Sequence, residues 1–395
     1  MKRFLTPTLL KVSFISFFTD IATEMLYPVL PLYLAATGYS AVTVGLLEGF
    51  SEAFSGLNKV LFGHISDQTG KRNIFMKIGY ALSAISRPLI GMTTSAWAIF
   101  GAKFADKVGK GIRTSPRDAI IISESSQENR GRAFGFHRTL DTLGAVIGPV
   151  LGIVILSIDP TDYRAVFLYA IIPGTLAVFL TFLLKKEPAL PSNAMKKKVS
   201  WQDFKKFWKS SSGSYKKIVV GFTIFALINS SNAFLILRAR ELGLPDLWVL
   251  GAYVVFNIVA ALAALPVGII GDKYGFKWTY IVGLLIFAVS YGLFGVGFSH
   301  IWIIIALFGI YGIFSAINDG TANAWLSVHI PKEYKATGLG LYTTLTSLAF
   351  FVASLLTGYL WNTVGSSATF TILSICTVAT MLYFVFTNTK PSEQK

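Results

Sequence analysis

Long apolar segments alternate with short polar loops along almost the whole chain. A helix needs roughly 20 mainly apolar residues to cross a bilayer, and twelve segments meet this requirement. They lie near residues 10–34, 41–64, 73–94, 96–115, 133–157, 165–184, 218–237, 247–270, 276–298, 301–325, 338–361 and 366–388. The pattern therefore predicts an all-α membrane protein with twelve transmembrane helices.

The longest polar segment, residues 185–217, separates the first six spans from the last six and contains ten lysines and two acidic residues. Lysine and arginine favour cytoplasmic loops. We therefore expect this segment and both termini on the cytoplasmic side of a plasma membrane, the inner membrane of a bacterium. The predicted organisation is an N-terminal six-helix half (1–184), a basic cytoplasmic linker (185–217) and a C-terminal six-helix half (218–395). Within the linker, WQDFKKFW favours a short interfacial amphipathic helix, and a solvated linker with aromatic anchors is the alternative.

The composition agrees with a bilayer environment, because 53% of the residues are hydrophobic and only 14% are charged, against about 25% in soluble domains. The net charge of +15 does not indicate a nucleic-acid partner, since the basic residues cluster between apolar segments. One cysteine and four scattered histidines predict no metal site. We find no phosphate-binding loop, nucleophile elbow or catalytic triad, so we expect neither an ATP-driven pump nor an enzyme, and no cofactor.

A loop pattern recurs in the two halves at an offset of 205 residues, as GHISDQTGKR and then GIIGDKYGFK. The matched residues are Gly63, Asp67, Gly70 and Arg72 in the first half, and Gly268, Asp272, Gly275 and Lys277 in the second. The halves are therefore predicted to be parallel copies of one six-helix unit. Transporters built from such repeats bind substrate near the middle of the membrane, between the copies.

The first of these loops resembles the G-x-x-x-D-x-x-G-[RK]-[RK] pattern of the major facilitator superfamily of secondary transporters, and the resemblance covers nearly the whole chain. It implies the twelve-helix fold of that superfamily. It also implies a gating role, in which loop charges pair with helix ends when the cytoplasmic side closes. The alternative is an ordinary tight turn. The gating candidates are Gly63, Asp67, Gly70, Arg72, Asp272, Gly275 and Lys277.

A second pattern, GAVIGPVLG in the fifth predicted span, resembles the G-x-x-x-G-P-x-x-G pattern that marks antiporters of this superfamily, including multidrug exporters. Small residues four positions apart permit close helix packing, and proline bends a helix. The candidate helix-packing residues are Gly144, Gly148, Pro149 and Gly152.

Further segments resemble a signature of the superfamily and one particular branch of it. KVGKG in the fourth predicted span is similar to the R-x-x-x-G signature of the superfamily, in which the arginine is thought to take part in proton transfer, although Lys107 stands in its place. FFTDIATEMLYPVLPLYL, ADKVGKGIRTSPRDA and NSSNAFLILRARELG together look like a bacterial branch of efflux carriers. No substrate follows from that likeness.

Ionisable side chains inside the predicted spans are functional candidates, because a charge in the bilayer is costly. Asp20 and Glu24 lie one turn apart in the first span, and Glu48 and Glu52 repeat this spacing in the second. A carboxyl group in a low-dielectric environment tends to hold a proton. We therefore predict that these four residues couple transport to protons. Sodium coupling and a permanent ion-pair network that never titrates are the alternatives.

The other polar residues within the spans differ between the two halves. The fourth span carries a basic stripe, and the fifth groups a histidine, an arginine and an aspartate, whereas the second half offers mostly neutral amides. We expect the first half to carry the charged groups and the proton coupling. We expect the second half to supply hydrogen bonds to the substrate. The predicted substrate-binding residues are Lys103, Asp106, Lys107, His137, Arg138, Asn229, Asn232, Asn257 and Asp319.

Together these patterns predict a secondary active transporter that moves a small molecule by alternating access, with proton-coupled efflux as the favoured direction. The alternatives are a proton-coupled importer of a small nutrient or anion and a lysolipid translocator of the same fold. A non-transporting receptor or scaffold is the alternative from another class. The expected partners are the small-molecule substrate, the proton and the lipid bilayer, and the expected state is a monomer.

Overall fold

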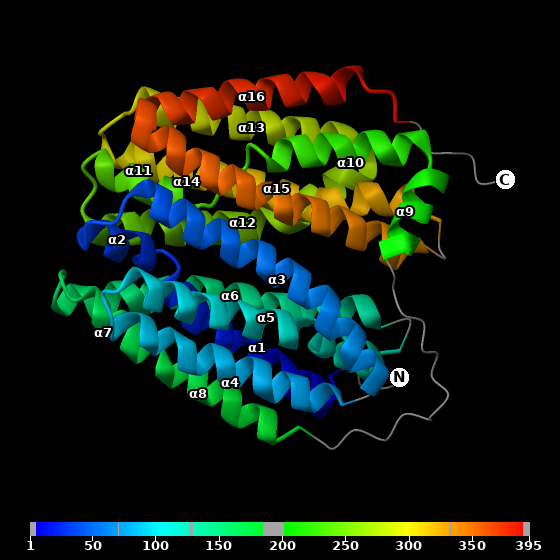
Figure 1. Ribbon diagram of the computed structural model, residues 1–395, viewed down its shortest axis with the longest axis horizontal. Helices are drawn as coiled ribbons and strands as arrows, with labels where there is room; N and C mark the ends of the chain where they lie inside the picture. The colour runs from blue at the N-terminus through cyan, green and yellow to red at the C-terminus, as the bar shows by residue number, and fades with distance from the viewer. Residues whose placement is uncertain (1–4, 70, 127–128, 185–200, 332–333, 390–395) are drawn as a thin grey trace. The chain divides into compact units, whose positions relative to one another are not determined.

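The computed structural model describes residues 5–69, 71–126, 129–184, 201–331 and 334–389 (Figure 1). Regular secondary structure in these ranges is helical throughout, which confirms the predicted all-α class. The helices before the linker are α1 (Pro7–Leu26), α2 (Val29–Ala36), α3 (Ala41–Thr69), α4 (Arg72–Gly91), α5 (Ala96–Glu124), α6 (Arg130–Ile158), α7 (Tyr163–Tyr169) and α8 (Ile171–Phe182). The later helices are α9 (Trp201–Ser210), α10 (Gly213–Ala226), α11 (Ala233–Glu241), α12 (Asp246–Tyr274), α13 (Phe276–Val296), α14 (Ile301–Val328), α15 (Lys335–Val364) and α16 (Ser366–Phe386).

Three predicted spans are interrupted in the structure. The first is divided into α1 and α2 at Tyr27 and Pro28, where proline has no N–H to donate to the carbonyl one turn back. The seventh is divided into α10 and α11, with residues 227–232 outside both helices. The sixth is divided into α7 and α8 at Ala170. The sequence predicts where the spans lie and not whether each helix is unbroken, so these breaks add detail to the twelve predicted spans. Residues 163–182 are still long and apolar enough to cross a membrane as one segment. Such breaks occur at membrane depth where protein or a water-filled cavity satisfies the backbone groups.

The internal repeat extends from the loop sequences to whole helices. α12 begins and ends 205 residues after α3, α14 begins 205 residues after α5, and α15 begins 205 residues after α6. At the second copy of the loop, Gly275 alone joins α12 to α13 and has a φ of 90°. Glycine adopts this backbone conformation without the clash that a side chain would cause.

Seven helical segments in the described part of the chain are long and apolar enough to cross a membrane by length and composition. They comprise residues 130–158, 163–182, 246–274, 276–296, 301–328, 337–364 and 366–386. The remaining predicted spans correspond to α1–α2, α3, α4, α5 and α10–α11, which carry charged residues or are divided by a break. The most polar spans of the protein therefore lie early in the sequence.

The structure divides into two compact units, which are described separately. Unit one comprises Met1–Tyr33 and Phe54–Lys198, and unit two comprises Leu34–Ala53 and Val199–Lys395. α3 contributes its first part to unit two and its last part to unit one. The division into halves 1–184 and 218–395 stays a prediction.

In unit one, α1 packs against α6 and α8, and α4 packs against α5 and α8 (Figure 1). The buried core includes Val12 and Ile15 of α1, Met76 and Tyr80 of α4, and Ile121 of α5, each 2% exposed or less. This apolar core fixes the positions of α1, α4 and α5, the helices that carry the polar residues described below.

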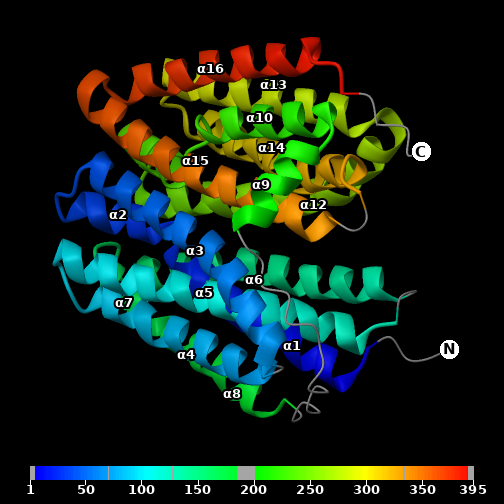
Figure 2. The same ribbon diagram turned by 45° about the vertical axis from the view of Figure 1, so that its right-hand side comes forward.

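Unit two is held together by aromatic rings. Phe222 on α10 packs against Tyr280 on α13 with ring centroids 4.7 Å apart, and Phe287 on α13 packs against Phe314 on α14 at 4.9 Å. α13 also lies along α16 (Figure 2). Such aromatic pairs contribute about 0.5–1.5 kcal/mol each beyond the burial of their surface.

The amphipathic segment of the predicted linker forms α9. Phe207 is buried and packs against Tyr334 and Tyr215, with ring centroids 5.6 and 5.3 Å apart. Lys206 and Lys209 on the same helix are exposed. α9 therefore has an aromatic face packed against the rest of unit two, and it also carries exposed lysines. Its location at a membrane surface stays a prediction.

Candidate functional site

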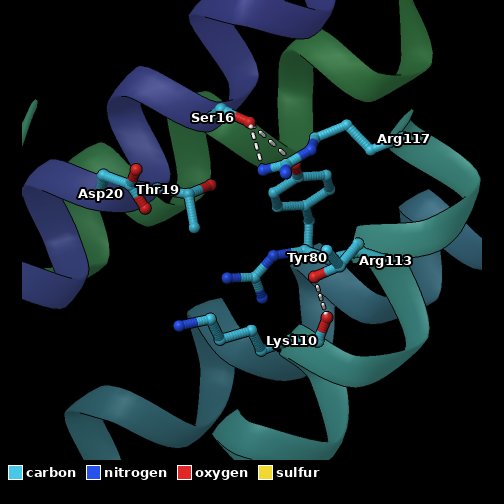
Figure 3. A pocket seen from close by; sticks show the side chains of 8 residues that line it. Ser16, Thr19, Asp20, Tyr80, Lys110, Arg113 and Arg117 are labelled. Atoms are coloured by element: carbon cyan, nitrogen blue, oxygen red, sulfur yellow. Dashed lines mark hydrogen bonds between the residues drawn. The ribbon is translucent and has the colours of Figure 1, made fainter. Parts of the chain in front are cut away.

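Unit one contains a small cavity between α1, α4 and α5 (Figure 3). Its volume is about 30 Å³, which is enough for about one or two water molecules. The lining is polar and consists of Ser16, Thr19, Asp20, Tyr80, Lys110, Arg113, Thr114 and Arg117. The cavity is therefore suited to water molecules and to the exchange of a proton.

α5 supplies the cations of the cavity. Lys110, Arg113 and Arg117 follow one another at intervals of three and four residues, which places them on one side of the helix. Arg113 is only 5% exposed. It donates a hydrogen bond to the Ser83 hydroxyl, and its guanidinium lies 4.7 Å from the ring centroid of Tyr80, within the range of a cation–π contact.

Asp20 is the single acid among the described residues that line the cavity. Figure 3 shows Lys110 and Arg113 extending towards the side of the cavity where Asp20 lies. The charges of Lys110, Arg113, Arg117 and Arg87 all act on its carboxylate. An ionised Asp20 is therefore compensated by several cations, and a protonated Asp20 leaves them with an excess of positive charge.

Arg117 forms an ion pair with the adjacent Asp118. Its Nε and Nη2 donate hydrogen bonds of 3.0 and 2.9 Å to one oxygen of the adjacent Asp118. Its Nη1 donates to the Ser16 hydroxyl at 3.2 Å, and the same hydroxyl lies 3.3 Å from that of Tyr80 (Figure 3). Arg117 therefore adds less net positive charge to the cavity than its position alone would suggest.

A buried ion pair lies beside the cavity. Arg87 of α4 is 2% exposed, and its Nη2 lies 3.1 Å from Oδ1 of Asp106 on α5. The same guanidinium donates to the Thr19 carbonyl at 3.3 Å and to the Thr23 hydroxyl at 2.8 Å, both on α1. One arginine thus joins three helices. The sequence predicts that Asp106 binds substrate, whereas the structure shows its carboxylate paired inside unit one.

α6 approaches α1 closely at the two acids. A Cβ atom added to Gly144 would lie 3.1 Å from Cβ of Asp20, and one added to Gly148 would lie 2.9 Å from Cβ of Glu24. Each would also lie 2.7 Å from a carbonyl oxygen of α1. The spacing of these glycines therefore matches the spacing of the acids, and the two helices can touch only because the side chains are absent.

The other selected residues of α6 have different surroundings. Pro149 and Gly152 are buried. His137 is 3% exposed, with its Nε2 3.4 Å from Oδ2 of Asp141, whereas Arg138 is exposed. The structure therefore separates the predicted group, because His137 and Asp141 share a buried face that Arg138 does not join.

The remaining predicted coupling residues are distributed over both units. Glu24 is half-buried in unit one, whereas Glu48 and Glu52 belong to the part of α3 in unit two. Glu48 is 5% exposed and Glu52 is half-buried. Among the described residues, no group of three or more His, Cys, Asp or Glu could hold a metal ion.

The basic stripe of α5 changes its environment along the helix. Lys103 is 7% exposed, and its ammonium lies 5.8 Å from the ring centroid of Tyr27 at the break after α1. Lys107 is half-buried, and Lys110 is exposed at the cavity. The stripe thus runs from a buried end near the break in the first span to an accessible end near Asp20.

Polar residues of unit two gather near the break between α10 and α11. The amide oxygen of Asn232 accepts a 2.8 Å hydrogen bond from the Tyr311 hydroxyl, and Asn229 is half-buried. Nδ2 of Asn257 is buried without a hydrogen-bond partner in the described structure. Asp319 is exposed and accepts a 3.5 Å hydrogen bond from its neighbour Asn318.

The predicted gating residues are described only in part. Gly70 lies outside the described residues, as do the surroundings of Gly63 and of the Asp67 side chain. Nη1 of Arg72 donates to the Ala119 carbonyl at 3.4 Å.

The second copy of the loop is described fully. Asp272 is exposed, and Nζ of Lys277 donates to the carbonyls of Val385 and Thr387 at 3.2 and 2.9 Å. Lys277 therefore binds the C-terminal end of α16, where a cation is favoured.

The sequence patterns do not indicate four residues of this site, namely Tyr80, Arg87, Arg113 and Arg117. Arg113 and Arg117 continue the spacing of Lys110, but the apolar pattern predicts that the fourth span ends at residue 115, whereas α5 runs to Glu124. Arg87 and Tyr80 stand among apolar residues of α4 with no acid nearby in the sequence. Their partners become visible only when α1, α4 and α5 pack together.

Comparison with known proteins identifies the family of this chain. The model of the Major Facilitator Superfamily matches residues 12–259 and 240–395. An uncharacterised transporter of the Major Facilitator type from Methanocaldococcus jannaschii is 32% identical over 393 residues, which cover 97% of this chain and 96% of the relative. The multidrug resistance protein MdtG of Salmonella schwarzengrund is 26% identical over 294 residues, or 72% of this chain and 70% of that protein.

Solved structures give the same result for the fold. A mutant of the nucleoside transporter NupG superposes with a TM-score of 0.76 at 14% identity, covering 96% of this chain and 99% of that one. A POT family transporter superposes with a TM-score of 0.78 at 14% identity and 95% coverage of both chains. At such low identity the likeness concerns the fold alone, and it agrees with the twelve-helix architecture expected from the sequence.

Proposed function

Because the chain belongs to the Major Facilitator Superfamily of membrane transporters, we propose that it is a secondary active transporter coupled to protons at Asp20. It moves a small molecule by alternating access, in which a central site opens to one side of the membrane at a time. The energy comes from the proton gradient, and the coupling group must bind a proton on one side and release it on the other.

The position of Asp20 carries this proposal. Its carboxyl group lines a polar cavity in a membrane helix and faces Lys110 and Arg113 of α5. Low dielectric favours the protonated carboxyl, whereas nearby cations favour the carboxylate. A movement of α5 relative to α1 changes the distance between the acid and the cations, and so decides whether the proton is held or released.

Contacts between α6 and α1 support a mechanical link to this group. Gly144 and Gly148 lie against the backbone of α1 beside Asp20 and Glu24. A tilt of α6 therefore displaces both acids, because the two glycines have no side chain that could separate the backbones of α6 and α1. When the protein alternates between its outward-open and inward-open states, movement of α6 would therefore change the surroundings of the proton-binding acid.

We propose export in exchange for protons as the direction of transport. The similarity to a protein named for multidrug resistance and the antiporter-like pattern from Gly144 to Gly152 support it. Import of an anionic solute together with a proton is the second candidate, and the cationic lining from Lys110 and Arg113 favours it.

Substrate contacts are proposed for the neutral polar residues of unit two and for the lysines of α5. Asn257 has an amide nitrogen with no partner inside the described structure, so a substrate acceptor could satisfy it. Asn229, Asn232, Asp319, Lys103 and Lys107 remain candidates from the sequence. Gating by the loop charges Asp67, Arg72, Asp272 and Lys277 is likewise proposed.

The direction of coupling can be measured in liposomes that contain the purified protein and an internal pH dye. A panel of candidate substrates is added on one side, with no ATP present. Proton movement opposite to the substrate supports export by antiport, and movement in the same direction supports the second candidate. A substrate that accumulates with no proton movement, and no response to a collapsed pH gradient, would contradict the proton coupling.

A further inference from the structure

The side chain of His329 lies between the end of α14 and the segment that follows α16. His329 is the residue directly after α14 and is 6% exposed. Its Nδ1 lies 2.9 Å from the Trp325 carbonyl oxygen, and its Nε2 lies 3.2 Å from the Thr389 carbonyl oxygen. We propose that His329 is a pH switch, which binds the C-terminal segment 387–389 to the end of α14 when the imidazole is protonated and releases it when the imidazole is neutral.

The first argument is the number of protons that the two contacts need. A carbonyl oxygen accepts hydrogen bonds and donates none, so each ring nitrogen must carry a hydrogen to bind its carbonyl. A neutral imidazole has one N–H group and a lone pair on the other nitrogen. In the neutral ring, one lone pair would therefore face a carbonyl oxygen at hydrogen-bonding distance. The imidazolium makes both hydrogen bonds, so protonation of His329 and attachment of Thr389 favour each other.

The second argument is the position of His329 at the end of a helix. The Trp325 carbonyl belongs to the last turn of α14, and His329 is the C-cap of that helix. A cation at a helix C-terminus is stabilised by the partial negative charge of the terminal carbonyls. Burial disfavours a charged ring, whereas hydrogen bonds to the charged form favour it. The two carbonyl contacts and the helix end therefore offset the cost of burying the imidazolium.

The third argument is that the same segment has a second cationic contact. Lys277 of α13 donates to the carbonyls of Val385 and Thr387 at 3.2 and 2.9 Å. With His329 at Thr389, two side chains bind the carbonyls of three alternate residues. Histidine, unlike lysine, changes its charge near neutral pH. The end of α16 and the residues after it are thus held by one lysine contact that does not depend on neutral pH and one histidine contact that does.

The charged groups around His329 do not provide a carboxylate in place of the carbonyls. α14 packs against α10, α12, α13 and α15, and it ends where α12 and α16 end and where α10, α13 and α15 begin. Asp272 is the acid among the described side chains within two turns of these helix ends, and it is exposed. The lysines there disfavour a positive ring. The proton on His329 therefore depends on the two carbonyls, and release of Thr389 weakens its binding. The titratable side chains described at these ends are Tyr215, Lys216, Lys217, Asp272, Lys273, Tyr274, Lys277, Tyr280, Tyr334, Tyr342 and Tyr383.

The test measures the mobility of the C-terminal segment by electron paramagnetic resonance of the full-length protein in detergent. A spin label is attached at Asn388→Cys, an exposed position beside Thr389, after Cys376→Ser has removed the single cysteine of the chain. We expect a restrained label in mildly acidic buffer and a mobile label in mildly alkaline buffer. The ratio of mobile to restrained label should rise about tenfold, as expected for the loss of one hydrogen bond from a charged donor. His300→Gln is the matched control, because His300 is an exposed histidine at the other end of α14, and it should keep this pH dependence.

Two substitutions of His329 should have opposite effects. His329→Gln gains no charge in acid, so the label should be mobile in both buffers. His329→Lys supplies a charged donor in both buffers, so the label should be restrained in both. The proposal is overturned if the label in the unchanged protein does not respond to pH, if either variant of His329 keeps the response, or if His300→Gln abolishes it. If His329→Gln does not fold, His329→Lys decides the question alone. Because neither substrate nor a gradient is used, these results do not depend on whether protons drive transport.

Discussion

Two nitrogens of the Arg87 guanidinium, Nε and Nη2, lie 3.2 and 3.1 Å from the same carboxylate oxygen of Asp106. The two residues are 2% and 8% exposed. Because the same arginine also binds the backbone of α1 at Thr19, the pair joins the three helices that form the cavity. We infer that its main role is to hold the cavity in shape.

Asp106→Asn should therefore destabilise the protein. It leaves the Arg87 charge buried without its partner, and breaking such a pair costs about 3–5 kcal/mol. The double variant Arg87→Met with Asp106→Leu should lose less than the two single changes together, because neither charge is left alone. Thermal unfolding in detergent measures both effects. If the unfolding temperature is unchanged and the KM for the transported substrate is raised, Asp106 binds substrate, as the sequence predicts, and does not mainly stabilise the cavity.

Gly148→Ala should impair folding or transport, because the new methyl group would lie 2.7 Å from a carbonyl oxygen of α1. Overpacking of this kind costs about 1–3 kcal/mol. Gly135→Ala in the same helix is the matched control, since a Cβ there has no atom within 4 Å. Thermal stability and initial transport rates are compared for both variants. Equal behaviour would show that α1 and α6 do not need their close contact at this glycine, and the proposed mechanical link to Glu24, which lies beside Gly148, would be wrong.

The helical architecture could be predicted because burial in a bilayer requires long apolar segments, and these are visible in a single sequence. The helix breaks are less predictable. Pro28 coincides with the break after α1, but Pro88, Pro116 and Pro149 lie inside α4, α5 and α6, which continue through them. Proline removes one backbone hydrogen bond in each case, and the surrounding helix packing decides whether the helix ends.

The cavity could be predicted only in part, since its contacts join residues that are distant in the sequence. Asp20 stands out as an acid in an apolar segment, and Lys110 belongs to a visible basic stripe. Arg87 gives no such signal, because its partner Asp106 lies 19 residues away and its contact Thr19 lies 68 residues away. The apolar pattern also ends the fourth span too early, which hides Arg117 beyond the predicted membrane boundary.

Lys277→Met should lower thermal stability and change the rate of cycling. The ammonium of Lys277 caps the carbonyls of Val385 and Thr387 at the end of α16, and a cation at a helix C-terminus contributes about 0.3–1 kcal/mol. Lys273→Met is the control, because Lys273 is an exposed lysine in the last turn of α12. Stability is followed by thermal unfolding, and turnover by substrate exchange in liposomes. If Lys277→Met cycles at the normal rate, the gating role of this loop is wrong, although the capping role remains.

The role of Asp20 as the proton-exchanging group leads to a prediction that separates coupling from transport itself. Asp20→Asn cannot exchange a proton, so it should abolish substrate accumulation driven by a pH gradient. Exchange of labelled for unlabelled substrate at equal concentrations needs no net proton movement, and we expect that activity to survive. Glu24→Gln, one turn further along α1, should have the same effect if the two acids act together.

A loop aspartate provides the control for that prediction. Hydrogen bonds from the hydroxyl and N–H groups of Thr161 lower the pKa of Asp159, so it is ionised under the same conditions but lies after the end of α6, outside the cavity lining. Asp159→Asn should therefore leave both accumulation and exchange unchanged. If Asp20→Asn and Glu24→Gln also accumulate substrate normally, their carboxyl groups do not carry the coupling proton. The cations around Asp20 would then belong to a permanent ion-pair network that orients α1, α4 and α5.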